Sequence, residues 1–353
     1  MSTHVNGRPS QPLRIGVVGL GYWGPNLVRN LHEVPDVEVA AICDLDEEAL
    51  AKVGRRFPAV RQTTSYEDVL ADDTVDAVVI ATPVGTHAEL AHEALEAEKH
   101  VFLEKPLASS LAEALALHDQ ATQRGLVLMV GHTFLYSPPV NMVRDLITSG
   151  AIGDIYFVSM SRVNLGIHQR DVSVVWDLGP HDFSILRYWL GETPTHVSAV
   201  SRGCVFPANP DIAFVHLEFP SGVIAHVELS WLAPSKLRRT TVVGSQRMVV
   251  YDDTSLEPVR IFDAGVQLDD PTSFGAYHLS YRTGDIVSPR IEVAEPLFLE
   301  MCGFRDSVRT GIPSRSSSAL AVEVVRIIES VDRSFAVGGE RVSVEAPRLA
   351  LVP

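Results

Sequence analysis

From Leu13 to about Val130 the chain alternates short apolar runs with amphipathic stretches. The apolar runs are RIGVVG, VEVAAIC, DAVVIATP, HVFLEKP and GLVLMVGH, and a pattern of helical periodicity separates each from the next. Strands that alternate with helical patterns in this way are typical of β-α-β units. The pattern predicts a doubly wound parallel sheet over residues 13–132, preceded by a flexible tail over residues 1–12.

Two helices of this region are predicted to begin at capping boxes. Thr86 precedes Glu89 by three residues, and Ser110 precedes Glu113 by three. In a capping box the hydroxyl of the first residue accepts a hydrogen bond from the backbone N–H three residues later, which fixes the start of the helix.

After about Gly150 the pattern changes to longer strands with alternating polarity. These are IYFVSMSRV, IAFVHLEF, VIAHVELSW, TTVV and MVVY, with turns at PSG and GSQR between the later pairs. Such hairpins predict an open, mainly antiparallel sheet in a second domain of residues 133–353. Two late helices are expected, from Pro296 to Gly311 and from about Ser318 to Ala336. They are expected to cover one of the two sheets, and one possibility is that they pack back on the first domain. The predicted fold class is α/β followed by α+β.

Composition narrows the class of protein and of partner. The 353 residues suit two domains, and 46% hydrophobic with 21% charged residues suit a globular chain with a large core. The net charge of −15 argues against nucleic acid and anionic membranes as partners, because both reward clustered Lys and Arg. A small-molecule substrate, even an anionic one, remains compatible with a local basic pocket.

The cysteines and the opening segment indicate the compartment. Cys43, Cys204 and Cys302 are widely spaced and odd in number, which predicts neither a disulfide framework nor a metal knuckle. The opening segment lacks a signal-peptide pattern, and no apolar run approaches the roughly 20 residues that span a bilayer. We therefore expect a cytoplasmic protein with reduced thiols and no metal site.

The segment RIGVVGLGYWG carries a dinucleotide fingerprint. Gly19, Gly21 and Gly24 have the spacing G-x-G-x-x-G between an apolar strand and a helical pattern. The first glycine permits a tight turn, the second lets the backbone approach a pyrophosphate, and the third lets the helix pack closely. The alternative is a tight loop without a ligand, but the strand and the helix on either side favour cofactor binding.

Asp44 supports NAD as the cofactor. It ends the second predicted strand twenty positions after Gly24, where a carboxylate accepts hydrogen bonds from the adenosine ribose. Its alternative role is to begin the acidic helix that follows. NADP stays possible, although the next basic residue is Lys52.

Two further polar clusters follow predicted strands. One comprises Ala81 to Pro83 and, after the next strand, Glu104 to Pro106. In a doubly wound sheet, ligands bind outside the carboxyl ends of the strands, so Lys105 is expected to point into a cofactor cleft. Its ordinary alternative is a solvated surface lysine.

The segment VVWDLGPHDFSILRYWLG supplies an acid and an imidazole. Asp177 and His181 are four residues apart, on one face of a helix. Asp177 is predicted to be the N-cap, with Pro180 in the first turn and the helix dipole keeping His181 neutral. A neutral imidazole can accept a hydroxyl proton, whereas the alternative is an ordinary cap with a buried histidine.

With these motifs the chain resembles the glucose-fructose oxidoreductase / inositol dehydrogenase / MocA (Gfo/Idh/MocA) family. The resemblance rests on GLGYWG at Gly19 to Gly24, EKP at Glu104 to Pro106, and D-x-x-x-H at Asp177 to His181, and it covers nearly the whole chain. It implies a dinucleotide-binding domain and an open, mostly antiparallel sheet that binds substrate and often forms dimers. We accordingly expect a homodimer or homotetramer.

The resemblance also implies roles for individual residues in an NAD(P)-dependent oxidoreductase. Lys105 would hydrogen-bond the reacting oxygen, His181 would exchange its proton, and Asp177 would position the substrate or the imidazole. The expected cofactor-binding residues are Gly19, Gly21, Tyr22, Trp23, Gly24, Asp44, Thr82, Pro83, His87, Glu104 and Lys105. The expected substrate-binding residues are Lys105, Tyr136, Arg162, Asn164, His168, Arg170, Asp177 and His181.

Within the family, GYWGPNLVRN, GHTFLYSP and WDLGPHD look similar to enzymes of nucleotide-sugar and aminosugar pathways. The expected reaction is hydride transfer between the nicotinamide and the 3-position of a nucleotide-activated hexose. The alternative substrate is a free or glycosidically bound aminosugar. The basic and polar residues just before Asp177 can reach sugar hydroxyls or a phosphate, or they form a solvated loop.

Three other functional classes remain open. A hydrolase or lyase of the same fold would keep its NAD bound and recycle it within each turnover. A nucleotide-responsive regulator would need no proton relay, so the presence of Lys105, Asp177 and His181 argues against it. A zinc enzyme using Asp177, His181 and His168 lacks a His-x-x-x-His or Cys pair to complete the site.

Overall fold

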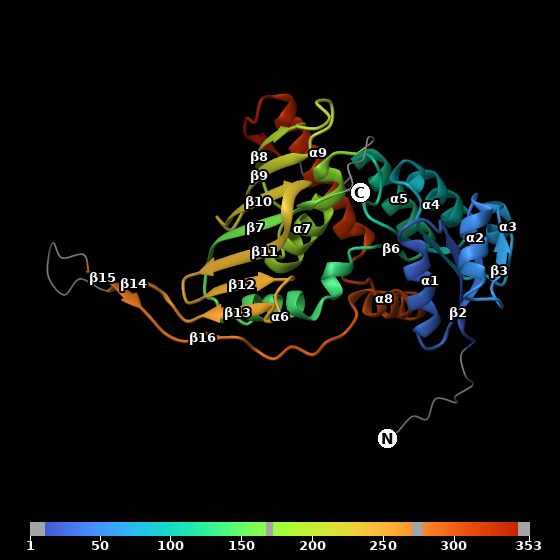
Figure 1. Cartoon of the computed structure of the whole chain (residues 1–353), viewed down its shortest axis with the longest axis horizontal. Coiled ribbons are helices and arrows are strands. Elements are labelled where there is room, and N and C mark those ends of the chain that lie inside the picture. Colours follow the sequence, from blue (N-terminus) through green and yellow to red (C-terminus); the bar gives the residue numbers. More distant parts are fainter. Residues whose placement is uncertain (1–10, 167–171, 270–277, 345–353) are drawn as a thin grey trace, which may run out of the picture. The chain divides into compact units, whose positions relative to one another are not determined.

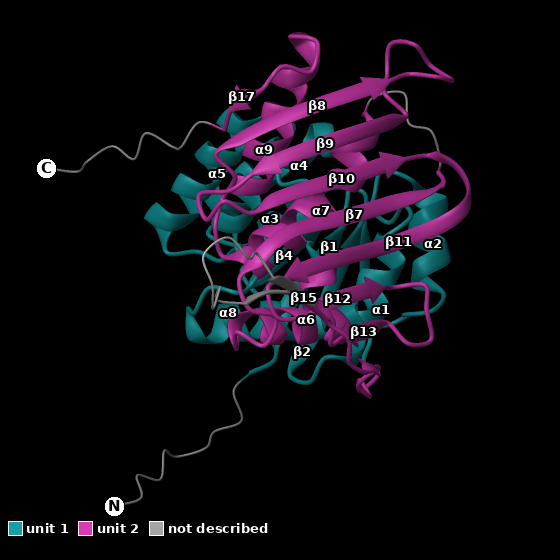
Figure 2. Cartoon of the chain, turned by 90° about the vertical axis from the view of Figure 1, so that its left-hand side faces the viewer, with its two compact units in different colours: residues 1–133, 294–322 teal, residues 134–293, 323–353 magenta. Residues whose placement is uncertain are grey.

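A computed structural model describes residues 11–166, 172–269 and 278–344 (Figure 1). The chain falls into two compact units, shown in different colours in Figure 2. Unit 1 comprises residues 1–133 and 294–322, and unit 2 comprises residues 134–293 and 323–353. Within the described ranges, no helix has the length and apolar character needed to cross a membrane.

Unit 1 contains a six-stranded sheet in the order β3-β2-β1-β4-β5-β6. All five neighbouring pairs are parallel, which confirms the predicted doubly wound sheet. The order reverses between β1 and β4, where such sheets bind their ligands. The strands are β1 (Leu13–Val18), β2 (Val37–Cys43), β3 (Arg61–Thr63), β4 (Ala77–Ile80), β5 (His100–Leu103) and β6 (Leu128–Val130).

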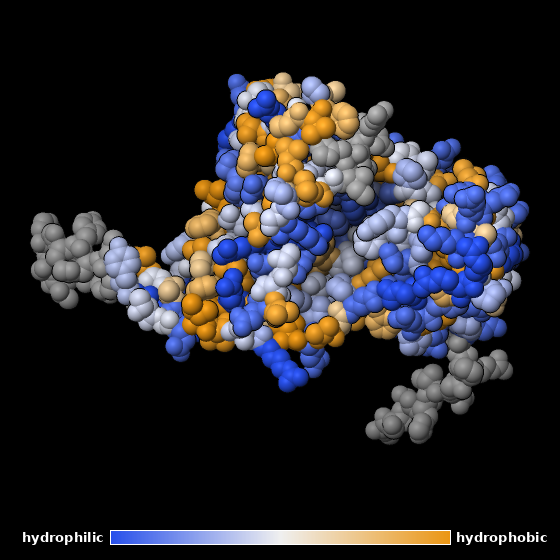
Figure 3. All heavy atoms as spheres, in the orientation of Figure 1, coloured by the Kyte–Doolittle hydropathy of each residue, from blue (hydrophilic) through white to orange (hydrophobic). Residues whose placement is uncertain are grey.

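The helices of unit 1 connect these strands and cover the sheet. They are α1 (Gly24–Glu33), α2 (Glu47–Gly54), α3 (Tyr66–Leu70), η1 (Val84–Thr86), α4 (His87–Glu96), α5 (Leu111–Arg124) and α8 (Pro296–Thr310). The late helix α8 packs against α1, and Arg29 of α1 forms an ion pair with Glu295 just before α8. The outer surface over α2 and α3 is mostly hydrophilic (Figure 3), as expected for amphipathic helices on a sheet.

One of the two predicted capping boxes forms its hydroxyl cap. The Ser110 hydroxyl accepts from the backbone N–H of Glu113 at 3.2 Å and begins α5. At Thr86 the predicted helix start is confirmed, since Thr86 is the N-cap of α4, but its hydroxyl makes no cap bond. The Thr86 hydroxyl instead donates to the carbonyl oxygen of Pro83 at 2.8 Å.

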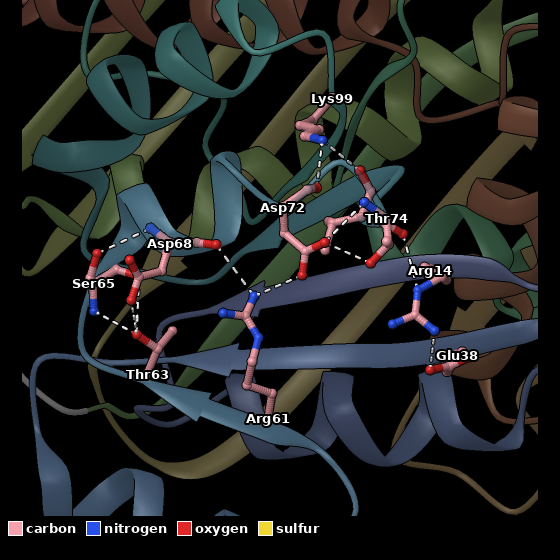
Figure 4. A network of polar contacts seen from close by, with 10 residues as sticks. Arg14, Glu38, Arg61, Thr63, Ser65, Asp68, Asp72, Thr74 and Lys99 are labelled. Carbon is pink, nitrogen blue, oxygen red and sulfur yellow. Dashed lines mark hydrogen bonds and ion pairs between the residues drawn. The ribbon is translucent and has the colours of Figure 1, made fainter.

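The strand β3 was not predicted, because its three residues RQT lack an apolar pattern. Side-chain contacts hold this edge of the sheet, as Figure 4 shows. Arg61 of β3 donates to the Asp72 carboxylate at 3.1 Å, and the Thr63 hydroxyl donates to Asp68 at 3.0 Å. Nearby, Lys99 donates to the carbonyl oxygen of Asp72. Polar contacts therefore stabilise an edge strand that buries little apolar surface.

Unit 2 contains a nine-stranded sheet in the order β16-β13-β12-β11-β7-β10-β9-β8-β17 and a separate hairpin. Only the β10–β7 pair of the nine-stranded sheet is parallel, so the predicted mostly antiparallel sheet is confirmed. The strands are β7 (Ile155–Leu165), β8 (His196–Arg202), β9 (Ile212–Glu218), β10 (Ile224–Ser230), β11 (Leu232–Gly244), β12 (Met248–Asp252), β13 (Val259–Phe262), β14 (Gly265–Asp269), β15 (His278–Arg282), β16 (Ile286–Val287) and β17 (Val342–Ser343).

Helices cover one face of this sheet. Helix α7 (Val174–Leu190) packs against β7, β9 and β10 and lies behind these strands in Figure 2, while α6 (Pro138–Thr148) packs against β12. The remaining helices are η2 (Thr133–Tyr136) and α9 (Ser318–Ala336). Phe157 and Ile224 are direct neighbours on β7 and β10, and they are 44% and 53% exposed. Exposed apolar neighbours on a sheet face are typical of contact surfaces, so the expected homo-oligomer has a candidate interface here.

Candidate active site

The glycine loop between β1 and α1 has the geometry that a dinucleotide requires. Gly19 has φ +89°, and a Cβ atom there would lie 2.7 Å from the backbone of Ala81. A Cβ on Gly24 would lie 2.0 Å from the carbonyl oxygen of Gly19, whereas a Cβ on Gly21 would meet nothing within 4 Å. The first and third glycines are therefore demanded by packing, and the second leaves open space beside the start of α1. Helix α1 has no side-chain cap, but Pro25 has no N–H and Asn26 already donates to the carbonyl oxygen of Trp23 at 2.9 Å. The helix therefore favours a phosphate mainly through the positive end of its dipole and the N–H of Gly24.

Asp44 lies directly after β2 and beside this loop. Its Oδ2 accepts from the backbone N–H of Leu20 at 2.5 Å, and its Oδ1 accepts from the backbone N–H of Asp46 at 2.9 Å. These two bonds fix the orientation of the carboxylate. The position agrees with a contact to the adenosine ribose, which we retain as a proposal. A groove next to it is lined by residues that include Lys52 and Arg55.

We expect Asp44→Ala to narrow the preference for NAD over NADP by about tenfold, because it removes a charged hydrogen-bond acceptor for the ribose and a repulsion of the 2′-phosphate. The ratio of kcat/KM for the two cofactors measures this effect. Asp46→Ala is the matched control, since Asp46 caps α2 through the N–H of Glu48. Equal or better efficiency with NADP in the unmutated enzyme would reject the assignment of Asp44.

Tyr22 and Trp23 lie at the tip of the glycine loop. Tyr22 is 82% exposed, and the two rings meet edge to face with centroids 5.7 Å apart. Exposed aromatic faces beside a phosphate-binding loop are available to a cofactor. Their predicted cofactor contacts remain a proposal.

His87, predicted to contact the cofactor, lies in the interior of unit 1. Its Nδ1 lies 2.8 Å from the carbonyl oxygen of Pro106, and its Nε2 lies 2.9 Å from that of Thr82. Burial lowers the pKa of His87, and the two carbonyl oxygens partly oppose this shift. A neutral imidazole has one N–H, so His87 donates to one of these two carbonyl oxygens and packs against the other, between the loop of Thr82 and Pro83 and the loop of Lys105. We now assign it a positioning role rather than direct contact with the cofactor.

Glu104 and Lys105 follow β5, as the motif predicted. Lys105 is half-buried, whereas the Glu104 side chain is buried and accepts from the backbone N–H of Lys105 at 3.3 Å. Burial raises the pKa of Glu104 to about 7, and the charge of Lys105 opposes this shift. A buried carboxyl is poorly placed to contact a cofactor directly, so the predicted contact of Glu104 is revised to a supporting role. His132, Thr133 and Glu300, also in unit 1, were not predicted from the sequence.

In unit 2, helix α7 begins earlier than predicted. Ser173 is the N-cap, its hydroxyl accepting from the backbone N–H of Trp176 at 3.5 Å. The prediction of Asp177 as N-cap is wrong: Asp177 lies within the first turn, and Pro180 and His181 lie one turn further. The effect of a helix dipole declines within the first turn, so the predicted influence of the dipole on His181 does not apply. Since both residues are helical and four positions apart, they do share one face.

Neighbouring aromatic side chains hold this face in place. The Nε1–H of Trp231 donates to Oδ2 of Asp177 at 3.1 Å. The ring of His181 meets the ring of Phe134 edge to face, with centroids 5.0 Å apart. Trp231, the residue just before β11, therefore orients the acid, and Phe134 of η2 orients the imidazole.

Arg162 lies in the interior of unit 2 rather than at the predicted substrate surface. Its Nε and Nη2 donate to the two carboxylate oxygens of Asp182 at 2.6 Å and 3.0 Å, and both side chains are buried. Its guanidinium also lies 4.5 Å from the centre of the Phe134 ring. Arg162 thus connects β7 to the residue that follows His181, and we revise its role from substrate contact to positioning.

The other predicted substrate residues are placed unevenly. Asn164 is half-buried near the end of β7, whereas Tyr136 is buried in η2, which does not support a substrate contact through its side chain. His168 and Arg170 lie outside the described residues. Arg238 of β11 was not predicted, because a single arginine in a strand carries no local signal.

Arg238 nevertheless lies beside the residues of the candidate site. Its guanidinium is 5.6 Å from the centre of the Phe134 ring, it donates to Asp253 at 3.0 Å, and its side chain remains about one-third exposed. Phe134 therefore contacts His181, Arg162 and Arg238, and of these two arginines only Arg238 retains substantial exposed surface.

Two family models match the chain. The model described as an oxidoreductase family with an NAD-binding Rossmann fold matches residues 13–132, and the GFO/IDH/MocA C-terminal domain matches residues 140–250. Among curated proteins, the NAD-dependent scyllo-inositol 2-dehydrogenase of Bacillus subtilis is 29% identical over 264 residues, which cover 71% of this chain and 77% of the relative.

Solved structures agree along nearly the whole chain. GenD2 from gentamicin A biosynthesis, in complex with NAD, has a TM-score of 0.81 and 27% identity, covering 98% of this chain and 100% of that one. UDP-N-acetylglucosamine 3-dehydrogenase GnnA from Acidithiobacillus ferrooxidans has a TM-score of 0.77 and 23% identity, covering 93% and 99%, and shows the same fold. The glycine loop, the two-domain fold and these matches show that the chain belongs to the Gfo/Idh/MocA family of NAD-dependent oxidoreductases.

Proposed function

We propose that the protein oxidises a secondary alcohol of a sugar or polyol, or reduces the corresponding ketone, with NAD as the cofactor. The observation that carries this proposal is the face of α7 on which Asp177 and His181 are held by Trp231 and Phe134. An oriented acid and imidazole suit proton exchange with a hydroxyl group. The similarity to an inositol dehydrogenase supports a polyhydroxylated substrate.

Each proposed residue has a distinct task during alcohol oxidation. His181 takes the hydroxyl proton as the C–O bond becomes a carbonyl, and Asp177 orients the substrate or the imidazole. Lys105 stabilises the negative charge that develops on the oxygen. The chemistry that NAD supplies when bound is acceptance of the hydride from the substrate carbon.

For the substrate we propose a nucleotide-linked hexose that is oxidised at its 3-hydroxyl. Arg238 supports this choice, because its partly exposed guanidinium, paired with Asp253 and beside the ring that contacts His181, can also bind a diphosphate. A glycosidically bound aminosugar is the second candidate, favoured by the 27% identity to a protein of gentamicin A biosynthesis over 98% of the chain.

We expect Arg238→Met to raise the KM for UDP-N-acetylglucosamine by about tenfold or more while the KM for scyllo-inositol stays unchanged, because only the first substrate carries phosphates. The absorbance of the reduced nicotinamide measures both reactions, alongside free and glycosidically bound aminosugars. Arg239→Met is the matched control, since adjacent strand residues point to opposite faces.

The possible outcomes test separately whether the protein is a sugar or polyol dehydrogenase and whether its substrate is linked to a nucleotide. Oxidation of polyols or aminosugars without oxidation of any nucleotide-linked sugar would reject the finer assignment. Product formation without net reduction of NAD would instead indicate a hydrolase or lyase that recycles its cofactor, and it would reject the dehydrogenase.

A further inference from the structure

Unit 1 contains a buried polar cluster that the proposed reaction has not used. Glu104 follows β5, His132 and Thr133 follow β6, and Glu300 lies on α8. Glu104, His132 and Glu300 are only 8%, 1% and 0% exposed. We call these four residues the carboxyl cluster. Two acids and an imidazole in the interior need a physical reason, because burying such groups costs free energy.

Glu300 is fully buried and receives one hydrogen bond. The Thr133 hydroxyl donates to its Oε2 at 2.6 Å, whereas its Oε1 has no hydrogen-bond partner among the residues that the structure describes. An ionised carboxylate with a bare buried oxygen is much less stable than a neutral acid. Burial raises the pKa of Glu300 well above its usual value, the bond from Thr133 partly opposes this shift, and the nearby Glu104 adds to it.

Glu104 is the acid that can carry a charge. Its carboxyl group packs against Gly131, where an added Cβ would lie 3.0 Å from Oε2, and it accepts from the backbone N–H of Lys105. Two acids that share an apolar region do not both ionise. Burial raises the pKa of Glu104 to about 7 and the Lys105 charge opposes this shift, so Glu104 is the acid of the cluster that ionises first as the pH rises.

The surrounding imidazoles do not supply a competing cation. Neither ring nitrogen of His132 has a partner among the described residues, and burial together with the Lys105 charge lowers its pKa to about 3. His87 on α4 faces the carbonyl oxygens of Thr82 and Pro106, and burial lowers its pKa as well. Lys105 is therefore the cation that acts on Glu104.

We propose that Glu300 is a positioning residue for Lys105. Through its bond to Thr133 it holds the turn of Gly131 to Thr133 against Glu104, so that the charge of Glu104 stays next to Lys105. This inference rests on the proposed function in one respect, namely that Lys105 is taken to stabilise the charge on the reacting oxygen. A residue on α8, far away in the sequence, thereby fixes the charge environment of the lysine.

The reactivity of the Lys105 amine tests the placement without a substrate. We expect Glu300→Leu to increase the rate at which acetic anhydride labels Lys105 at neutral pH by about threefold or more, because the turn of Gly131 to Thr133 is released and no longer holds the Glu104 carboxylate beside the ammonium. Glu300→Gln keeps an oxygen for the Thr133 hydroxyl and stays neutral, so its rate should remain near that of the wild type. Mass spectrometry after proteolysis measures the labelling, with Lys52 and Lys236 as internal references.

Two further variants keep the test decisive. Thr133→Val removes only the hydroxyl, so it should reproduce the effect of Glu300→Leu, and the double variant should add nothing because both remove one contact. Ser307→Ala, which changes another buried residue of α8, is the matched control and should leave the Lys105 rate unchanged. Labelling at the wild-type rate in both Thr133→Val and Glu300→Leu would overturn the proposal.

Turnover separates this inference from the proposed function. With a sugar that the enzyme oxidises, Glu300→Leu should lower kcat by about tenfold, Glu300→Gln should restore it, and the Kd of NAD should not change. If Lys105→Met retained the wild-type kcat, the catalytic role of Lys105 would fail while the labelling result still stood. If Lys105→Met lost activity but Glu300→Leu did not alter labelling, only the positioning role would fail.

Discussion

Replacement of His181 by alanine is expected to lower kcat for alcohol oxidation by about 10²- to 10⁴-fold, the usual cost of removing a positioned general base. The Kd of NAD should change little, because the glycine loop that binds the dinucleotide belongs to unit 1 and His181 to unit 2. Stopped-flow measurement of the reduced nicotinamide gives the rate, and fluorescence titration gives the Kd.

The controls for this prediction separate chemistry from folding. His226→Ala removes a histidine of β10 that stacks with Phe214 on the sheet of the same unit, and it should retain turnover. Lys105→Ala should resemble His181→Ala, and the double variant should be far less impaired than the product of the two losses if the residues act together. An undiminished rate in His181→Ala, with substrate saturating and hydride transfer rate-limiting, would refute the mechanism.

Local sequence patterns were sufficient for the architecture and for the cofactor loop. The strands β1, β2, β4 and β5 can be recognised from the sequence as continuous apolar runs, because buried parallel strands are hydrophobic on both faces. The glycines at positions 19, 21 and 24 are explained by a tight turn, open space and close helix packing, and these are local properties of the chain. Helix α8 ends at Gly311, as its sequence predicted.

Element boundaries were less predictable where two residues compete for one role. Asp177 and Ser173 are both residue types that favour the N-cap position. The helix extends one turn further toward the N-terminus than predicted, so Ser173 is its N-cap. At Thr86 the preceding Pro83 starts a tight turn whose carbonyl oxygen takes the hydroxyl that a capping box needs. At Ser173 the helix boundary differs from the prediction, whereas at Thr86 the boundary agrees and only the cap bond is missing.

The supporting residues could not have been predicted, because their partners lie far away in the sequence. Glu300 and Thr133 are 167 positions apart, and Arg162 and Asp182 come from a strand and a helix. A glutamate on a helix or an arginine in a strand has no local feature that marks it as buried. Such residues become visible only when the fold supplies their contacts.

The ion pair of Arg162 and Asp182 leads to the largest expected effect on stability. We expect Asp182→Ala to lower the free energy of unfolding of unit 2 by about 3–5 kcal/mol, because it leaves a buried guanidinium without its carboxylate. Arg162 is poorly compensated otherwise, since its Nη1 has no partner among the residues that the structure describes. Urea unfolding followed by tryptophan fluorescence measures the change, and three of the four tryptophans, Trp176, Trp189 and Trp231, belong to unit 2.

A double variant distinguishes the cost of an unpaired charge from the value of the pair itself. Arg162→Met with Asp182→Leu replaces both charges by apolar groups, and we expect it to recover most of the lost stability, because burying an ion pair costs about as much as the attraction returns. If the double variant were as unstable as Asp182→Ala, the pair itself would be the stabilising feature. Recovery of stability together with reduced kcat would show that the pair serves to place His181, the residue that precedes Asp182 on α7.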